Sequence, residues 1–481
     1  MHAPSFNRVI NPTGLLFGAV GFLMMRLWMS LCFFPLSGWN NIRLAPSFML
    51  RFGPTPYPGL DGGPITTWIY GPVPLFLNLP ATFTHDAVTA LIIVGAINLL
   101  IAIGPVAIVL FAASSPSQQG ASWTDRVWAL LICLSLWPNS SLQYIQADNA
   151  AVAFGLIANF LLLRTHVRSW THLLPAAFCS ALAVWSKQTA LGLMLAQVLW
   201  LTFTADLRTA IRYTLACATC GVALGGLFLT WFGFDGLWLN LVQLPARIPF
   251  CASFLERTIT LWPHLAGYVL LPALALTVAR RSVWKRDSVW LLPALTWLCL
   301  LPSGLMSIYK IGGNANSLNG VLYLLPVAAL AFTAMLRSWK NHAASALLTI
   351  GVIAVTITQI SLSPARSLRP LTEPMHQAEY LAKQFPDKIY FPWFPLVTYF
   401  SEHRFYHAED GLYTRYTAQQ EPARAVAFQN LPPLWSITAF LGPTADLGII
   451  TQLQPPTAQK TIVGGWTVYS WILPDTPAPK L

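Results

Sequence analysis

Four ionisable residues stand inside or at the ends of long apolar runs: Arg26, Asp148, Lys187 and Lys310. A charge near the centre of a bilayer costs about 2.5–3.5 kcal/mol on insertion scales, so such residues often mark a functional site. For Asp148 and Lys187, a polar cavity and a side chain that reaches the membrane surface are equally good interpretations. For Arg26 we expect the side chain to reach the surface.

A further carboxylate, Asp61, lies in a stretch rich in Gly, Pro and aromatic residues, GPTPYPGLDGGPITTWIYGPVPLFLNLP, residues 53–80. It could act as a general base on an acceptor hydroxyl, or help to hold a divalent cation. Leu-Asp-Gly-Gly is also a good turn sequence, and a turn is the slightly favoured interpretation. No cofactor is assigned beyond that candidate cation, and no metal ligands are predicted.

The elements that position these residues must be membrane helices. Of 481 residues, 55% are hydrophobic and 9% are charged, whereas an ordinary soluble domain has about 25% charged residues. The net charge of +11 follows the loops between apolar runs, which indicates membrane orientation and argues against nucleic-acid binding.

Apolar runs of roughly 20 residues predict about eleven membrane-spanning helices. The third run turns polar at Pro138, so we expect a broken or re-entrant helix there. An amphipathic loop is expected over residues 233–257. The expected spans are 14–36, 88–113, 127 onward, 148–164, two that flank Lys187, 213–232, 258–279, 288–308, 321–336 and 343–362.

With a cytoplasmic N-terminus, the cytoplasmic segments carry about twice as many Lys and Arg residues as the longer outer loops, as the positive-inside rule requires. Residues 1–362 then form a multi-pass domain of the cell membrane, with a long first outer loop at 37–86. Residues 363–481 form a small extracytoplasmic α+β domain with a helix at 373–385 and extended runs at 388–393, 447–451 and 466–473. His403 and His407 in that domain have i, i+4 spacing, but the segment is better interpreted as a solvated turn near an acceptor site than as a metal site.

Four short motifs at the outer ends of the expected spans resemble those of the polytopic GT-C glycosyltransferases, of mannosyltransferase-like type. They are Tyr70-Gly71-Pro72-Val73-Pro74-Leu75, Gln146-Ala147-Asp148-Asn149, Trp185-Ser186-Lys187-Gln188-Thr189 and Lys310-Ile311-Gly312-Gly313-Asn314-Ala315-Asn316-Ser317. The resemblance covers residues 14–340. It implies transfer of a hexose or pentose from a polyprenyl-phosphate donor to a glycan, lipid or protein acceptor outside the cytoplasm.

The resemblance also implies roles for individual residues. The family has an acidic residue early in the first outer loop, where this chain has Asn40 and Asn41. Asn cannot act as a base, so either Asp61 takes that role, with Asp148 in reserve, or the chain is a non-catalytic membrane partner. Asp148 has a structural alternative, which is to pair with Lys187.

The cations expected to hold the donor phosphate are Lys187, Lys310, Arg247 and Arg257. Trp68 and Tyr70 could stack on a sugar or lie against lipid, and Asn314 and Asn316 could bind sugar hydroxyls or form an ordinary polar turn. A transporter or flippase for a lipid-linked or polar substrate is the alternative function, although the chain lacks the repeated halves common in that class.

Overall fold

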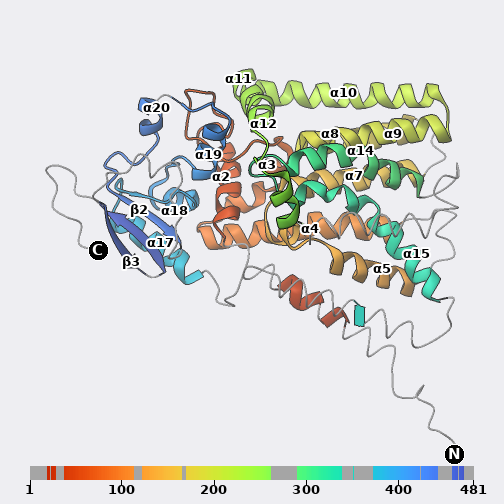
Figure 1. The fold of residues 1–481 in the computed structure, drawn as a ribbon, viewed down its shortest axis with the longest axis horizontal. Coiled ribbons are helices and arrows are strands. Elements are labelled where there is room, and N and C mark those ends of the chain that lie inside the picture. The colour runs from red at the N-terminus through yellow and green to blue at the C-terminus, as the bar shows by residue number, and fades with distance from the viewer. Residues whose placement is uncertain are drawn as a thin grey trace, which may run out of the picture.

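A helical bundle with a small mixed α/β domain at one end makes up the chain (Figure 1). The computed structural model describes residues 19–21, 23–28, 37–112, 122–164, 170–261, 290–337, 350–351, 372–422, 424–441, 458–463 and 465–470. The expected fold class is confirmed at this level: the chain is mostly helical, with a C-terminal sheet.

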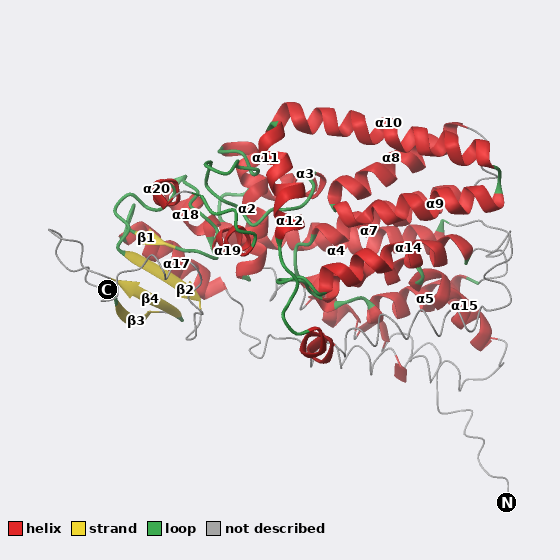
Figure 2. Cartoon of the chain, turned by 45° about the horizontal axis from the view of Figure 1, so that its top comes forward, coloured by secondary structure: helices red, strands yellow, loops and turns green. Residues whose placement is uncertain are grey.

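Four helices of the described residues are long and apolar enough to cross a membrane. They are α4 (Ala87–Phe111), α7 (Ala147–Arg164), α10 (Leu207–Phe232) and α14 (Leu291–Ile308). The shorter α8 (Trp170–Ser186) and α9 (Leu191–Thr204) lie among them (Figure 2). These helices are those of an integral membrane protein. The total of eleven spans stays a prediction, because most of 258–279 and of 343–362 lies outside the described residues.

Two of the expected spans are interrupted. α5 (Trp123–Leu136) ends just before Pro138, as predicted, and the five-residue α6 (Asn139–Gln143) leads on to α7. Pro disfavours helical backbone in the residue that precedes it. The tenth span is a 3-10 helix, η6 (Ala315–Tyr323), followed by α15 (Leu325–Arg337), with a bend of 52° between them.

The side chain of Arg26 is buried among other residues of the chain, which differs from the expected exposure at the membrane surface. Its side chain is only 2% exposed, and its guanidinium donates hydrogen bonds to the carbonyl oxygens of Leu134, Ser135 and Trp137. These carbonyls belong to the end of α5, where the last turn of a helix has no backbone partners of its own. A cation there also complements the helix dipole. Arg26 therefore satisfies the carbonyls that are left without backbone partners where α5 ends before Pro138.

Replacing Arg26 with Met is expected to destabilise the bundle, because several buried carbonyls lose their donor at a cost of about 1–3 kcal/mol each. The measurement is the thermal unfolding midpoint of the detergent-purified protein. Arg164→Met is the matched control, since Arg164 is exposed at the end of α7. An unchanged midpoint for Arg26→Met would contradict this account.

Residues 37–86, expected as the first outer loop and called the outer segment below, are more ordered than their composition indicated. The outer segment contains α2 (Gly38–Phe52), α3 (Val73–Leu77) and η2 (Leu79–Phe83). The side chain of Ser37 caps α2 by accepting from the backbone N–H of Asn40, as N-cap residues do. Pro46 and two adjacent Asn residues hid this helix from sequence reasoning, although most of its residues are buried.

The expected amphipathic loop at 233–257 is also largely helical. It forms α11 (Phe234–Trp238), a π-helical turn at Leu239–Gln243 and α12 (Leu244–Arg247). Gly233 ends α10 with a φ of 77°, a left-handed conformation that suits Gly.

Among its described residues, the C-terminal domain has four helices and a four-stranded sheet of order β1-β2-β4-β3. Its elements are α17 (Thr372–Gln384), β1 (Ile389–Tyr390), α18 (Pro395–Glu402), α19 (Glu409–Thr417), α20 (Arg424–Gln429), β2 (Ile437–Leu441), β3 (Gln459–Val463) and β4 (Trp466–Ser470). β1 and β2 are parallel, and the other pairs are antiparallel. The expected helix at 373–385 and the strands within 388–393 and 466–473 are confirmed; 447–451 lies outside the described residues.

One hydrophobic core joins the two parts of the chain. Phe48 of α2 and Leu91 of α4 belong to the same buried cluster as Phe391 and Trp466 of the C-terminal domain. The rings of Phe48 and Tyr399 meet edge to face, with their centroids 5.3 Å apart. The amphipathic α2 thus lies between the membrane helices and the sheet domain (Figure 1).

Candidate functional site

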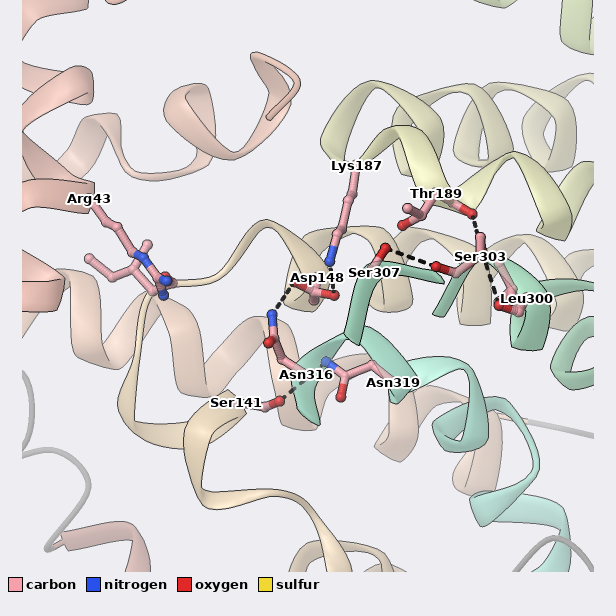
Figure 3. A network of polar contacts seen from close by, with 11 residues as sticks. Arg43, Ser141, Asp148, Lys187, Thr189, Leu300, Ser303, Ser307, Asn316 and Asn319 are labelled. Atoms are coloured by element: carbon pink, nitrogen blue, oxygen red, sulfur yellow. Dashed lines mark hydrogen bonds and ion pairs between the residues drawn. The ribbon is translucent and has the colours of Figure 1, made fainter. Parts of the chain in front are cut away.

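The ion pair between Asp148 and Lys187 lies where α7 begins and α8 ends. Lys187 Nζ is 2.6 Å from Asp148 Oδ1, and both side chains are at least nine-tenths buried. The other carboxylate oxygen, Oδ2, accepts a hydrogen bond of 2.9 Å from Asn316 Nδ2. Figure 3 shows the lysine and the asparagine approaching Asp148 from opposite sides. Two buried charges that satisfy each other in this way are far cheaper than either alone.

The Tyr-Gly-Pro motif brings the outer segment against this pair. The backbone N–H of Gly71 donates to the carbonyl of Ser186 at 3.2 Å. A Cβ at Gly71 would lie 1.7 Å from the carbonyl oxygen of Trp185, so only Gly permits the approach. The ring of Tyr70 consequently lies beside Lys187, with its centroid 5.8 Å from Nζ, within the range of a cation–π contact.

Amide side chains hold the segment that leads into α7. Asn149 donates to Asn98 Oδ1 at 2.6 Å and to the carbonyl of Ser141 at 2.7 Å. Asn319 donates to Ser141 Oγ at 3.3 Å, as Figure 3 shows. This network explains why polar residues interrupt the predicted third span: they position Asp148.

The helix α2 contributes three polar residues to the same region. Asn40 accepts from the backbone N–H of Ile145 at 2.7 Å, and Asn41 accepts from the backbone N–H of Leu396 at 3.0 Å. Arg43 donates to the carbonyl of Ile145 at 2.8 Å, opposite the Asp148–Lys187 pair in Figure 3. Both Asn side chains are therefore structural ties, one to the membrane helices and one to the start of α18.

Helix α19 of the C-terminal domain contacts the outer segment. Arg415 is 1% exposed and donates to the carbonyls of Pro58, Gly59 and Leu60. A Cβ at Gly411 would lie 2.2 Å from the carbonyl oxygen of Thr66. Burial lowers the pKa of Arg415 to about 10, so the guanidinium stays charged at neutral pH. These contacts fix the outer segment along much of its length.

His407 also contacts the outer segment, and both of its ring nitrogens are hydrogen-bonded, so it is unavailable to a metal. Its Nδ1 accepts from the backbone N–H of Ile65 at 2.7 Å, and its Nε2 lies 3.0 Å from the carbonyl of Ala427. Burial lowers its pKa to about 4, so the ring is neutral at neutral pH. His403 instead ends α18 in a left-handed conformation. Among the described residues, no group of His, Cys, Asp and Glu could hold a metal ion.

Asp410, in the first turn of α19, contacts the outer segment at Thr67, two residues after Ile65. Its Oδ2 accepts a hydrogen bond from the hydroxyl of Thr67. Burial raises the pKa of Asp410, while the hydrogen bond from Thr67 and the charge of Arg43 lower it. Arg43 thus acts electrostatically on Asp410. Because Arg43 also donates a hydrogen bond to Ile145, it links the C-terminal domain to the segment before α7.

Two cations, Arg43 and Lys187, and two carboxylates, Asp148 and Asp410, therefore lie around residues 67–70 of the outer segment. Thr67, which contacts Asp410, is three residues from Tyr70, which contacts Lys187; their Cα atoms are at most about 10 Å apart. The same bound of about 10 Å separates Ile145, which contacts Arg43, from Asp148. The arrangement suits an anionic substrate bound beside a group that needs a base.

Among the described residues, Asp61, Trp68 and Asn314 make no hydrogen bond to Asp148 or Lys187, although the rings of Trp68 and Tyr70 meet with their centroids 5.5 Å apart. Asp61 is exposed in a Gly59–Gly62 turn, as the favoured interpretation predicted, and its charge raises the pKa of Arg415, which burial lowers overall. Trp68 is 0% exposed, and its indole donates to the carbonyl of Gly71. Asn314 is exposed and caps η6.

The remaining predicted cations lie around residues 245–257 and 308–310. Lys310 donates to the carbonyl of Pro245, and burial lowers its pKa. Arg257 donates to the carbonyl of Ile308 at 3.3 Å, and Arg247 is exposed at the end of α12. Among the described residues, none of these three cations contacts Asp148 or Lys187.

Known structures share this architecture. ArnT from Cupriavidus metallidurans, in the apo state, has a TM-score of 0.59 with 11% sequence identity, over 95% of this chain and 98% of that one. The oligosaccharyltransferase AglB from Archaeoglobus fulgidus, in complex with an inhibitory peptide and a dolichol-phosphate, has a TM-score of 0.50 at 11% identity, over 88% of this chain and 69% of that one. The chain therefore shares its fold with ArnT. No family model and no curated protein matches the sequence.

Arg43 and Asp410 are charged residues at the cluster that the sequence analysis did not assign. Arg43 follows Asn40 by three residues, so the two share one face of α2, which is a usable signal once that helix is known. Asp410 had no sequence signal of its own, because its proximity to Thr67 depends on how the C-terminal domain docks.

Proposed function

We propose that the chain is an integral membrane glycosyltransferase that transfers a hexose or pentose from a polyprenyl-phosphate donor to an acceptor on the extracytoplasmic side. The observation that carries the proposal is Lys187, a buried cation at the end of a membrane helix in a GT-C fold. A polyprenyl chain lies in the bilayer with its phosphate at the surface, and a cation at a helix end is suited to meet it.

Lys187 has the hydrogen-bonding capacity that this role needs. An ammonium group carries three N–H donors. In the described part of the chain, one donor binds Asp148 and the ring of Tyr70 covers another side of the group. Asp148 orients Lys187, and Asn316 keeps Asp148 in place. The departing phosphate of a donor would gain negative charge, which such a fixed cation stabilises.

The other predicted residues divide into two groups within this proposal. Tyr70 and Asn316 lie at the ion pair, so we assign them to the donor sugar and its linkage. Arg247, Arg257 and Lys310 would attract the anionic headgroup from a distance, since none of them contacts the pair. The orientation with a cytoplasmic N-terminus and an outer C-terminal domain belongs to the proposal as well.

A non-catalytic membrane partner with the same fold is the second candidate. The observation that favours it is the commitment of Asn40 and Asn41 to structural hydrogen bonds. At these positions the chain has amides that bind backbone N–H groups, and neither amide can take a proton from an acceptor.

A transfer assay separates the two candidates. Membrane vesicles with and without the chain are supplied with undecaprenyl phosphates that carry tritiated hexoses or pentoses, and label is followed into the lipid, glycan and protein fractions. Chain-dependent transfer from one donor supports the enzyme. Binding of undecaprenyl phosphate with no transfer from any donor would leave the non-catalytic partner as the function.

A further inference from the structure

Asp410 combines three properties that a catalytic base needs. It is partly buried at the contact between the C-terminal domain and the outer segment. One oxygen accepts from the hydroxyl of Thr67, and the other accepts no hydrogen bond from any described residue. Burial raises the pKa of Asp410, although the hydrogen bond from Thr67 and the charge of Arg43 lower it. The hydrogen bond from Thr67 fixes the carboxylate in position and leaves the lone pairs of the other oxygen free.

The other carboxylates considered for this role are less suitable. Both oxygens of Asp148 are engaged, one by Lys187 and the other by Asn316. Hydrogen bonds thus occupy both oxygens that would have to accept the proton of an acceptor hydroxyl. Asp61 lies in an exposed turn, next to the carbonyls of Gly59 and Leu60 that Arg415 binds. Asp410 is the carboxylate of the cluster whose environment leaves it a base.

The position of Asp410 also relates it to Lys187. The stretch from Thr67 to Tyr70 spans at most about 10 Å between Cα atoms, and Thr67 contacts Asp410 while Tyr70 contacts Lys187. A donor phosphate at Lys187 and an acceptor group at Asp410 would therefore bind at the two ends of this short stretch.

We propose, resting on the proposed function, that Asp410 is the catalytic base that activates the acceptor. The Asp410 carboxylate takes the proton of the acceptor hydroxyl as that oxygen attacks the anomeric carbon. The new carbon–oxygen bond forms as the bond from the anomeric carbon to the phosphate oxygen breaks. The phosphate leaves with the bonding electron pair and remains beside Lys187, and Asp410 then releases its proton to water.

The test compares Asp410→Asn with two variants in the vesicle assay. Thr67→Val removes the hydrogen bond to Asp410 but keeps the carboxylate. Asp387→Asn makes the same chemical change at an exposed ion pair of the C-terminal domain. Binding of undecaprenyl phosphate is measured beside transfer. We expect Asp410→Asn to lose at least about 100-fold in transfer and to bind as the wild type does, Thr67→Val to lose less than about tenfold, and Asp387→Asn to match the wild type.

The outcomes separate the two levels of inference. Wild-type transfer with Asp410→Asn within threefold of it would overturn the role of Asp410 and leave the proposed function intact. An equal loss in Asp410→Asn and Thr67→Val would also overturn it, because the shared hydrogen bond would then be what matters. Absence of transfer by the wild type would overturn the proposed function, and the role of Asp410 with it.

Discussion

Replacing Lys187 with Met is expected to lower sugar transfer by about 100-fold or more, the size of effect seen when one electrostatic donor to a developing charge is removed. The donor phosphate would lose the cation that stabilises it as the sugar departs. Affinity for undecaprenyl phosphate should fall as well, because the same cation meets the phosphate before the reaction. Both quantities can be measured on the purified protein and on vesicles.

This variant also leaves Asp148 buried without its cation, and breaking a buried pair destabilises a protein by about 3–5 kcal/mol. The double variant Lys187→Met/Asp148→Asn separates the two effects, since Asn removes the orphaned charge and retains an acceptor for Asn316. We expect it to recover the unfolding midpoint but not the transfer rate. Lys460→Met, at an exposed cation of β3, is the matched control.

Recovery of transfer in the double variant would contradict the role of Lys187. It would mean that the lysine serves only to neutralise Asp148, and that another cation holds the donor phosphate. Arg43 would then be the first residue to examine, because it binds the carbonyl of Ile145, three residues before Asp148 (Figure 3).

The second large effect is expected at Gly71. Even Ala there would place its Cβ 1.7 Å from the carbonyl oxygen of Trp185, a distance at which the backbone must move. The outer segment would separate from the end of α8, so Tyr70 would leave Lys187 and the hydrogen bond from Gly71 to Ser186 would break. We expect loss of measurable transfer and faster proteolytic cleavage within residues 53–70.

Gly226→Ala is the matched control for this prediction. Gly226 lies on α10, and a Cβ there meets nothing within 4 Å; in a helix, Ala is also favoured over Gly by about 1 kcal/mol. The control should keep wild-type transfer and resist proteolysis. If Gly71→Ala behaves in the same way, the close approach to Trp185 is not needed for function.

The sequence predicted the elements whose signals are local. α7 and α14 appear as long apolar runs, and Pro138 marks the end of α5 because its effect on the preceding residue does not depend on the fold. The proximity of Asp148 to Lys187 was open to prediction, because a buried charge in each of two neighbouring spans is cheapest when paired.

What the sequence left open depends on contacts between distant segments. Arg26 was expected at the membrane surface, because nothing near it in the chain announces the carbonyls at the end of α5. α2 was missed because its apolar face is complete only against the C-terminal domain. Asp410 and Thr67 are more than three hundred residues apart, and no local pattern connects them.

The core that α2 shares with the sheet domain has a consequence for how the protein matures. Synthesis proceeds from the N-terminus, so Phe48 and its neighbours emerge long before Phe391 and Trp466 exist to cover them. During that interval the membrane helices can already be inserted while an apolar helix face stays open at the membrane surface. The last quarter of the chain therefore completes the core of α2, and a chain that ended before Phe391 would leave Phe48 and its neighbours uncovered.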